Sequence, residues 1–327
     1  MNKIVVDLLG ADKSEVDLLE GAIKAINEDP DLKVCLCGYK SEIEEHLNKY
    51  AFNSQQLEII DSLEEVTNLD SPSRAFKQKA NSSLILGLKK CKEEDDVKGF
   101  VSFGATGAVM VSSMFIVGRM EQISRPTLSS MLLDEKGNNF CIVDCGANVD
   151  CKVEHLLDFA KMGVAFMKTN GVRNPRVALL SNGKEEKKGN ELVKEAHQLF
   201  LKQDFNFVGN IEGNRVLSGD CDVVVCDGFS GNILLKTIEG AAKTVFKDLV
   251  NIAKHSSKDE ANILMDSVKN LLNKYDYNSK GGAILLGINK VLVKGHGGAN
   301  SETVYNCIRI ANELVKNELV EKIKSMY

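Results

Sequence analysis

The sequence predicts an α/β protein in which helices cover a parallel or mixed β-sheet. Along the whole chain, an apolar strand is followed by a polar or glycine-rich turn and then by a helix. The chain has 327 residues, of which 43% are hydrophobic, so it can bury a full core. We therefore expect a single α/β domain over residues 1–327.

The first expected elements follow this rhythm closely. Residues 4–8 and 33–36 are short apolar runs that are typical of strands, and each precedes a helical pattern, at residues 16–26 and 41–49. A further strand at residues 57–60 leads into a polar stretch. These alternating elements predict the first strands of the sheet and the helices that cover them.

The polar segment 70–83, DSPSRAFKQKANSS, interrupts the rhythm and contains a proline. We expect a loop or a helix entry that lies over the functional site, where Arg74, Lys77 or Lys79 would close on an anion. The alternative is an ordinary solvated connection, and the pattern alone favours that alternative.

Three strands in the middle of the chain end in polar, glycine-rich turns. Residues 100–103 run into GATGA, residues 140–143 into DCGANVD, and residues 177–180 into SNGKEEKKGN. Ligands of open α/β sheets collect outside the carboxyl ends of the strands. We therefore expect these turns to meet at one edge of the sheet.

The segment 222–240, DVVVCDGFSGNILLKTIEG, joins a buried strand directly to an amphipathic helix. A helix start offers unpaired N–H groups and the positive end of the helix dipole, and the turn adds Asp227, Ser230 and Asn232. This pattern predicts that an anion binds at the turn. The alternative is an ordinary turn of the kind that every parallel sheet needs.

Two helical patterns follow between residues 243 and 274, and they predict a helical hairpin at about residues 241–276. The apolar faces would close a dimer, bind an acyl chain or touch a bilayer surface; packing against the sheet is the alternative that the pattern alone favours. The two apolar stripes are Val245, Phe246, Leu249, Val250 and Ile252, and Leu264, Met265, Val268, Leu271 and Leu272.

Composition excludes several classes of protein. The net charge of −5 and the pI of about 5.7 argue against a nucleic-acid partner, which needs a basic face. The chain begins without an apolar signal segment and has no run long enough to span a membrane, so we expect a cytoplasmic, reducing compartment. The nine cysteines show no zinc-like pairing, and those at 141, 145, 221 and 226 are expected to pack in the core.

Several long motifs in one register resemble the PlsX family, the acyl-carrier-protein-dependent phosphate acyltransferases. The resemblance covers almost the whole chain. The motifs are VSFGATGAVM at 101–110, RPTL at 125–128, DCGANVDCKVEHLLDFAKMG at 144–163, NPRVALLSNGKEEKKGNEL at 174–192, FVGNIEG at 207–213, GDCDVVVCDGFSGNILLKTIEG at 219–240 and HGGAN at 296–300.

This resemblance implies a fold and a reaction. The fold is a three-layer αβα sandwich of the isocitrate and isopropylmalate dehydrogenase type, with a protruding helical hairpin, in a homodimer. The family moves an acyl group from acyl-acyl carrier protein to inorganic phosphate without a cofactor. A membrane glycerol-3-phosphate acyltransferase then uses the acyl phosphate in bacterial phospholipid synthesis, so peripheral contact with the inner face of the membrane is also expected.

Matching the motifs residue by residue gives the expected site. Lys188 would face the phosphate or the developing oxyanion, Asn232 would donate its amide to the carbonyl or the phosphate, and His296 would protonate the leaving thiolate or hold a structural hydrogen bond. Asp144, like Asp227, is expected mainly to organise a turn. Further substrate contacts are expected from Thr106, Gly107, Asn148, Asp227, Ser230, Gly231 and Arg74.

The chain also departs from the family pattern. The usual aspartate–methionine–glycine–glycine–aspartate run is DLLGAD here, the usual asparagine of the GNTGA turn is Ala105, and the proline expected after RPTL is missing.

The alternative functions are a phosphate acetyltransferase-like enzyme that uses acyl-CoA, and a catalytically weak scaffold at a membrane surface. A dehydrogenase is disfavoured because no triad of metal-binding aspartates is recognisable.

An acidic carrier protein must dock on an acidic enzyme. We therefore expect a local basic patch at the mouth of the site, formed by Lys236, Lys243, Lys247 and Lys254.

Overall fold

The computed structural model describes residues 2–11, 15–275 and 282–327. These residues form one eleven-stranded sheet with the order β3-β2-β1-β4-β11-β10-β5-β6-β9-β7-β8. The strands are β1 (Asn2–Asp7), β2 (Leu32–Gly38), β3 (Leu57–Asp61), β4 (Val97–Ser102), β5 (Thr127–Leu133), β6 (Asn139–Val143), β7 (Arg176–Ser181), β8 (Asn206–Glu212), β9 (Val223–Val225), β10 (Ala283–Leu286) and β11 (Val291–Lys294).

The sheet has two parallel halves that run in opposite directions. The strands β3, β2, β1, β4 and β11 are parallel to one another, and so are β6, β9, β7 and β8. The antiparallel strands β10 and β5 lie between the halves, and each of the three pairings β11–β10, β10–β5 and β5–β6 reverses the direction. The expectation that all turns leave the same edge of the sheet is therefore wrong.

Helices cover both faces of the sheet. The helices of the described residues are α1 (Glu15–Glu28), α2 (Lys40–Leu47), α3 (Pro72–Gln78), α4 (Ser83–Glu93), α5 (Thr106–Ile116), α6 (Val153–Thr169), α7 (Glu191–Phe200), α8 (Gly228–Lys254), α9 (Lys258–Tyr275), α10 (Ser301–Lys316) and α11 (Leu319–Lys324). One core cluster joins the sheet to α1, α2, α6, α7, α10 and α11. The other joins it to α3, α4, α5 and the beginning of α8.

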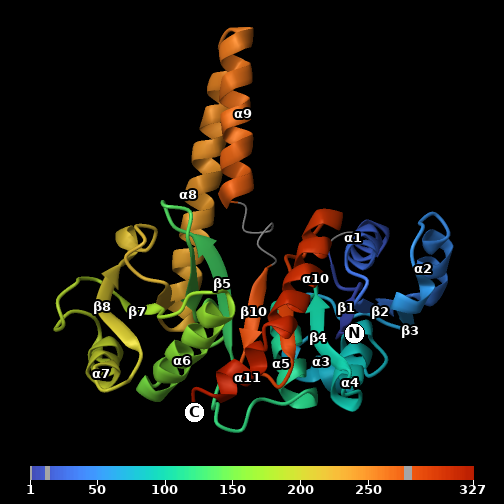
Figure 1. Cartoon of the computed structure of the whole chain (residues 1–327), viewed down its shortest axis with the longest axis horizontal. Coiled ribbons are helices and arrows are strands. Elements are labelled where there is room, and N and C mark those ends of the chain that lie inside the picture. The colour runs from blue at the N-terminus through green and yellow to red at the C-terminus, as the bar shows by residue number, and fades with distance from the viewer. Residues whose placement is uncertain (1, 12–14, 276–281) are drawn as a thin grey trace.

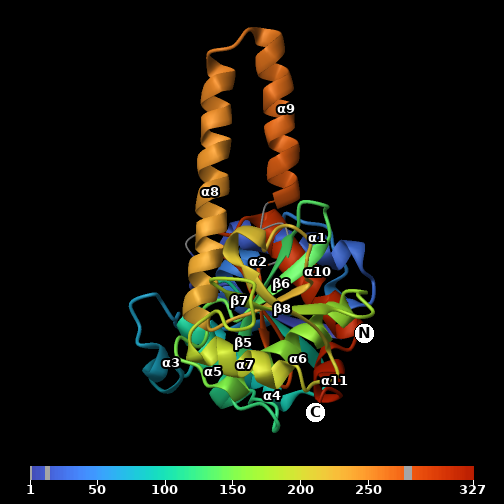
Figure 2. The same ribbon diagram turned by 90° about the vertical axis from the view of Figure 1, so that its left-hand side faces the viewer.

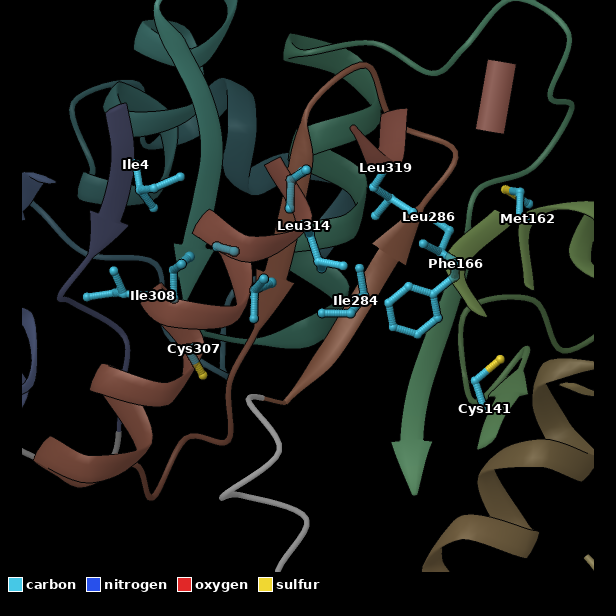
Figure 3. Close-up of a cluster of buried hydrophobic side chains, with 14 of the residues drawn as sticks. Ile4, Cys141, Met162, Phe166, Ile284, Leu286, Cys307, Ile308, Leu314 and Leu319 are labelled. Atoms are coloured by element: carbon cyan, nitrogen blue, oxygen red, sulfur yellow. The ribbon is translucent and has the colours of Figure 1, made fainter. Parts of the chain in front are cut away.

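Alternation along the strands builds these two cores. On β1, Ile4 and Val6 point into the first core and Val5 points into the second. Figure 3 shows part of the first core, where Phe166 of α6 and Leu314 of α10 lie against the sheet. The arrangement is the three-layer αβα sandwich that the family resemblance implies.

Asparagines of the glycine-rich motifs start two of the helices. The side-chain oxygen of Asn190 accepts a hydrogen bond from the backbone N–H of Val193 at 2.9 Å and so caps α7. Asn300 caps α10 in the same way, through Thr303. Both asparagines satisfy N–H groups that a helix start leaves unpaired, which explains their position directly before a helix.

The long hairpin of α8 and α9 stands out from the body of the molecule (Figures 1 and 2). Its two helices pack against each other and bury Ala253 and Val268, while Val245, Ile252 and Ile263 stay more than half exposed. The alternative in which the hairpin packs on the sheet is therefore wrong. The first helix of the hairpin is continuous with the turn that begins at Asp227.

Candidate active site

A cleft of about 530 Å³ lies where the two halves of the sheet meet. The turns after β4, β6 and β9 each contribute one glycine to its wall, namely Gly104, Gly146 and Gly228, and the turn after β11 contributes Gly295 and Gly297. Because glycine has no side chain, an anion can approach backbone N–H groups at such turns. Two of the three expected turns, those after β4 and β6, thus face a single cleft although the halves run in opposite directions, whereas the turn after β7 lines a different cavity.

The start of α5 forms one wall of the cleft through Ala105 and Thr106. Ala105 is the N-cap residue of α5, and the helix has no side-chain cap. The alanine in place of the family's asparagine therefore leaves the positive end of the helix open toward the cleft. Gly107 does not line the cleft. It packs against Pro72 of α3, whose Cγ would lie 3.0 Å from a Cβ at position 107.

Several polar groups at the start of α8 are already hydrogen-bonded within the protein. The carboxylate of Asp227 accepts hydrogen bonds from the backbone N–H and the hydroxyl of Ser230, at 2.8 and 2.9 Å. The N–H of Gly228 donates to the carbonyl of Asn148, and the N–H of Gly231 donates to the carbonyl of Asp227. The start of α5 is therefore better suited to an anion than the start of α8, where the pattern alone predicted one.

Asp144 organises the turn that supports α8. Its buried carboxylate accepts backbone hydrogen bonds from Leu128, Ala147 and Asn148, and burial raises its pKa against the opposing effect of these bonds. The amide of Asn148 donates to Asp144 at 2.8 Å and to the carbonyl of Pro126 at 2.9 Å. Asn148 does not line the cleft, and its contact with substrate stays a prediction.

Thr106, Asn232 and His296 are brought together in the cleft. Asn232 lies one turn into α8, facing Gly146, whose missing side chain leaves room for the amide. The Nδ1 atom of His296 accepts the backbone N–H of Gly298 at 3.0 Å. A neutral His296 therefore carries its proton on Nε2, where it can serve as a donor.

Two lysines of the cleft were absent from the expected catalytic site. Lys236 lines the cleft from α8 and forms an ion pair with Glu239 at 2.9 Å. Lys294 lines it from the end of β11, and its Nζ donates to the carbonyls of Phe103, at 3.5 Å, and Gly295. The available signal was that Lys294 stands directly before the GHGGAN motif.

A buried carboxylate lies beneath the cleft. Asp7, at the end of β1, accepts hydrogen bonds from the hydroxyls of Ser83 and Ser102, at 2.5 and 2.7 Å, and from the N–H of Leu9. Burial raises the pKa of Asp7 to about 6, although these bonds and the charge of Lys294 act in the opposite direction.

Arg74 lies on α3 and is exposed, outside the cleft wall. The segment before it reaches the cleft through Asn68 instead. Lys79, which was expected as a possible anion contact, forms an ion pair with Asp70 at 2.7 Å and also donates to the carbonyl of Glu65. The segment is thus held partly by its own ion pair, and a role for Arg74 in binding stays a prediction.

Lys188 does not line the cleft. It is exposed and packs on Gly183, in the loop after β7. Its neighbours Gly189 and Asn190 line a separate cavity of about 440 Å³ together with Asp227 and Ser230, on a different side of the first turn of α8 from Asn232. The expected meeting of Lys188 and Asn232 in one cavity is not observed in the single chain.

An apolar groove runs along the other flank of α8. It has a volume of about 930 Å³ and is lined by side chains of β5, α8 and α9, including Leu132, Ile233, Val245 and Leu271. Phe229 lines both this groove and the polar cleft. The two spaces therefore adjoin at one side chain.

In the described part of the chain, no group of three or more His, Cys, Asp or Glu side chains has the arrangement of a metal site. No described helix combines the length and the apolar character needed to cross a membrane.

Comparison with known proteins decides the family. A family model described as a fatty acid synthesis protein matches residues 2–322. The chain is 40% identical to a phosphate acyltransferase of Halothermothrix orenii, over 98% of this chain and 97% of the relative. It is 39% identical to a phosphate acyltransferase of Clostridium novyi, over 99% and 98% of the two chains. The chain belongs to the phosphate acyltransferase family.

Members of the phosphate acyltransferase family are enzymes of the acyltransferase class, and so is this chain. Among solved structures, one similar chain is the EutD phosphotransacetylase of Staphylococcus aureus, with a TM-score of 0.63 and 17% identity over 96% of this chain and 94% of that one. Another is a phosphotransacetylase of Streptococcus pyogenes, with a TM-score of 0.64 and 19% identity over 98% of this chain and 94% of that one. A putative 4-hydroxythreonine-4-phosphate dehydrogenase of Salmonella typhimurium has a TM-score of 0.54 at 14% identity and coverage of 96% and 99%. These likenesses confirm the dehydrogenase-like fold.

Proposed function

We propose that this phosphate acyltransferase moves a long fatty acyl group from acyl-acyl carrier protein to inorganic phosphate, and that the acyl phosphate serves phospholipid synthesis. The observation that carries this proposal is the contact between the polar cleft and the apolar groove at Phe229. A thioester carbonyl in the cleft has an apolar space beside it for its hydrocarbon chain, which an acetyl group would leave unfilled.

The proposed reaction is a direct displacement. A phosphate oxygen attacks the thioester carbonyl carbon, and the tetrahedral intermediate then expels the pantetheine thiolate as its C–S bond breaks. The products are acyl phosphate and the carrier thiol, and the proton that the thiolate gains is balanced by the one that hydrogen phosphate loses. Holding both substrates in attack geometry lowers the barrier by about 7–11 kcal/mol in well-oriented systems, so a covalent enzyme intermediate is not required.

Three residues of the cleft have proposed roles in this displacement. Phosphate binds at the open start of α5 beside Thr106, where helix N–H groups favour an anion. The amide of Asn232 donates to the oxyanion that forms on the carbonyl. His296, with its proton on Nε2, donates to the leaving thiolate.

The role proposed for Lys188 needs an additional condition. In the single chain it lies beside the second cavity, with Asp227 and Ser230, so it meets substrate at Asn232 only if its loop moves or a second copy of the chain supplies it. Asp227, Ser230 and Gly231 support the site in our proposal by fixing the first turn of α8, rather than by binding phosphate directly.

A row of lysines on α8 is the proposed docking surface for the carrier protein. Lys236, Lys243, Lys247 and Lys254 are exposed, and their spacing of seven, four and seven residues puts them along one side of the helix. The row begins at the cleft, which Lys236 lines. An acidic carrier that binds along this row would deliver its thioester at the mouth of the cleft.

The hairpin is proposed to contact a second copy of the chain or a membrane surface. The exposed apolar side chains Val245, Ile252 and Ile263 support such a contact, because they leave apolar area in water on a projecting element. Delivery of acyl phosphate to a glycerol-3-phosphate acyltransferase would benefit from the membrane contact.

Product analysis with two donors tests the proposed function. The purified protein is incubated with phosphate and either palmitoyl-acyl carrier protein or acetyl-CoA, and acyl phosphate is trapped with hydroxylamine. We expect palmitoyl phosphate at a kcat/KM at least a hundredfold above that for acetyl phosphate. The reverse preference would favour an acetyltransferase, and liposome binding without either product would favour a membrane scaffold.

A further inference from the structure

We propose that Lys294 is a further catalytic residue, whose ammonium group binds the attacking phosphate, and that Asp7 is a positioning residue that holds Lys294 and the start of α5 in place. This assignment presupposes the phosphate transfer proposed above. It is based on the way in which the neighbouring strands β1, β4 and β11 and the helix α5 meet at one wall of the cleft.

Lys294 lies beside the proposed phosphate position. It is the last residue of β11 and pairs with Ser102, the last residue of β4, so it lies next to the turn that leads into α5. It lines the same cleft as Thr106 and His296. Its ammonium group donates hydrogen bonds to the carbonyls of Phe103, in the turn after β4, and of Gly295, in the turn after β11, and is thereby held between these two turns.

Asp7 is connected to the cleft floor through a chain of hydrogen bonds. The hydroxyl of Ser102 donates to Asp7 at 2.7 Å, and the oxygen of the same hydroxyl accepts the N–H of Gly104 at 3.2 Å. Gly104 lines the cleft, and a Cβ at this position would lie 3.8 Å from Oδ2 of Asp7. The carboxylate therefore sits one layer below the phosphate site and fixes the turn that begins α5.

The ammonium group of Lys294 is also close enough to the carboxylate of Asp7 for the two charges to attract each other. The lysine acts on the pKa of Asp7 in the direction expected of a nearby cation. The other groups that face the carboxylate are the hydroxyls of Ser83 from α4 and Ser102 from β4, and the thiol of Cys37 from β2. A buried carboxylate with one neighbouring cation and fixed hydroxyl donors is suited to hold that cation in a single position.

Phosphate kinetics of Lys294→Met test the first half of the proposal. We expect the KM for phosphate to rise at least tenfold, or kcat/KM for phosphate to fall at least a hundredfold, while the KM for the acyl donor changes less than twofold. Lys290→Met is the matched control. Lys290 lies directly before β11, the strand that Lys294 ends, and its ammonium group also donates to backbone carbonyls, those of Val97 and Glu94, but it does not line the cleft. An unchanged KM and kcat/KM for phosphate in Lys294→Met would overturn the assignment.

Asp7→Asn tests the positioning role. We expect kcat/KM for phosphate to fall at least tenfold at pH 7.5 with the donor KM unchanged. In the wild type, kcat/KM for phosphate should also fall below about pH 6 more steeply than phosphate protonation explains, and this additional decline should disappear in Asp7→Asn. A purely structural role would lower thermal stability and leave both readouts as in the wild type.

Direct binding separates this inference from the proposed function. Equilibrium dialysis with radiolabelled phosphate, without an acyl donor, should give at least tenfold weaker binding for Lys294→Met than for the wild type and for Lys290→Met. If the wild type forms no acyl phosphate from any donor, the proposed function fails, whereas the dialysis result still decides whether Lys294 binds phosphate. Lys294→Arg, which keeps the charge, should retain more binding than Lys294→Met and checks that a folded variant is being compared.

Discussion

Gly231 lies directly against the carbonyl oxygen of Asp144, so that a Cβ at position 231 would be 1.9 Å from this oxygen. The contact joins the first turn of α8 to the turn after β6 and thereby holds two walls of the cleft together. No side chain fits between them.

Gly231→Ala should therefore destabilise the protein. A Gly-to-Ala change inside a helix normally stabilises by up to about 1 kcal/mol, but overpacking of this kind costs roughly 1–3 kcal/mol or more. Urea unfolding would measure the net loss. The control is Gly240→Ala in the same helix, where a Cβ would meet nothing within 4 Å. We expect Gly240→Ala to be neutral or stabilising; equal stability of the two variants would contradict the close contact.

Asn232→Ala should lower kcat by about 10²–10³, which corresponds to the loss of one oxyanion donor. Asn232 is exposed in the cleft, so its removal should leave the melting temperature within about 1–2 °C of the wild type, as expected for a surface change. Steady-state kinetics with palmitoyl-acyl carrier protein and phosphate would measure the effect. A kcat within threefold of the wild type would exclude a donor role.

Comparison of Lys188→Ala with Lys187→Ala would decide whether Lys188 takes part in the reaction, as the family motif implies, or stays outside the cleft, as in the single chain. The family motif implies that Lys188 stabilises the reacting anion, so we expect kcat to fall at least tenfold in Lys188→Ala alone. Both lysines are exposed, and neither change should affect folding. Equal rates in the two variants would remove Lys188 from the mechanism.

Ala242→Phe should narrow the apolar groove, which Ala242 lines. We expect the KM for a palmitoyl donor to rise at least fivefold and the KM for a butyryl donor to stay the same, because only the longer chain reaches this part of the groove. Thr244→Phe is the control, since Thr244 is exposed on α8 and does not line the groove. A uniform effect on both donors would argue against chain binding there.

Reversing the charges of Lys243 and Lys247 to glutamate should raise the KM for the acyl carrier protein substrate at low salt. Attraction between exposed charges is screened beyond about 10 Å at 0.1 M salt, so the difference from wild type should shrink as salt is added. The matched control reverses Lys49 and Lys92, which are exposed elsewhere on the molecule. If both double variants behave alike, the carrier protein does not dock along α8.

The stability of the protein should depend on pH through Asp7. Burial raises its pKa from 3.8 to about 6, so the unfolded chain releases this proton at lower pH than the folded chain does. As the pH rises from 4.5 to 7, the wild type should therefore lose about 2 kcal/mol of unfolding free energy relative to Asp7→Asn. Urea unfolding at pH 4.5 and pH 7 would measure it, and parallel behaviour of the two proteins would contradict the buried, perturbed carboxyl.

Local patterns in the sequence predicted the layers of the fold and most strand–turn–helix units. The apolar run that ends at Cys226 and the polar turn at Asp227 are followed by α8, as the pattern indicates. The opposite direction of the two half-sheets was not predictable in this way. It depends on the pairing of β10 with β5, whose residues Ile284 and Ser129 are far apart in the chain.

The site was predictable only where a motif residue sits on a turn at the cleft. Thr106, Asn232 and His296 do so. The loop of Lys188 follows β7 and lies on another side of α8, which spacing along the chain does not reveal. Lys294 was missed because a lysine at a strand end usually points into solvent, and its position beside α5 results from the pairing of β11 with β4.

A crystal structure of the protein soaked with phosphate would test the central claim most directly, because the cleft and the second cavity are distinct places. We expect phosphate at the start of α5, within hydrogen-bonding distance of the backbone of Thr106 and of the ammonium group of Lys294. Phosphate bound instead between Asp227 and Asn190, with the cleft empty, would contradict the assignment of the reaction to the cleft.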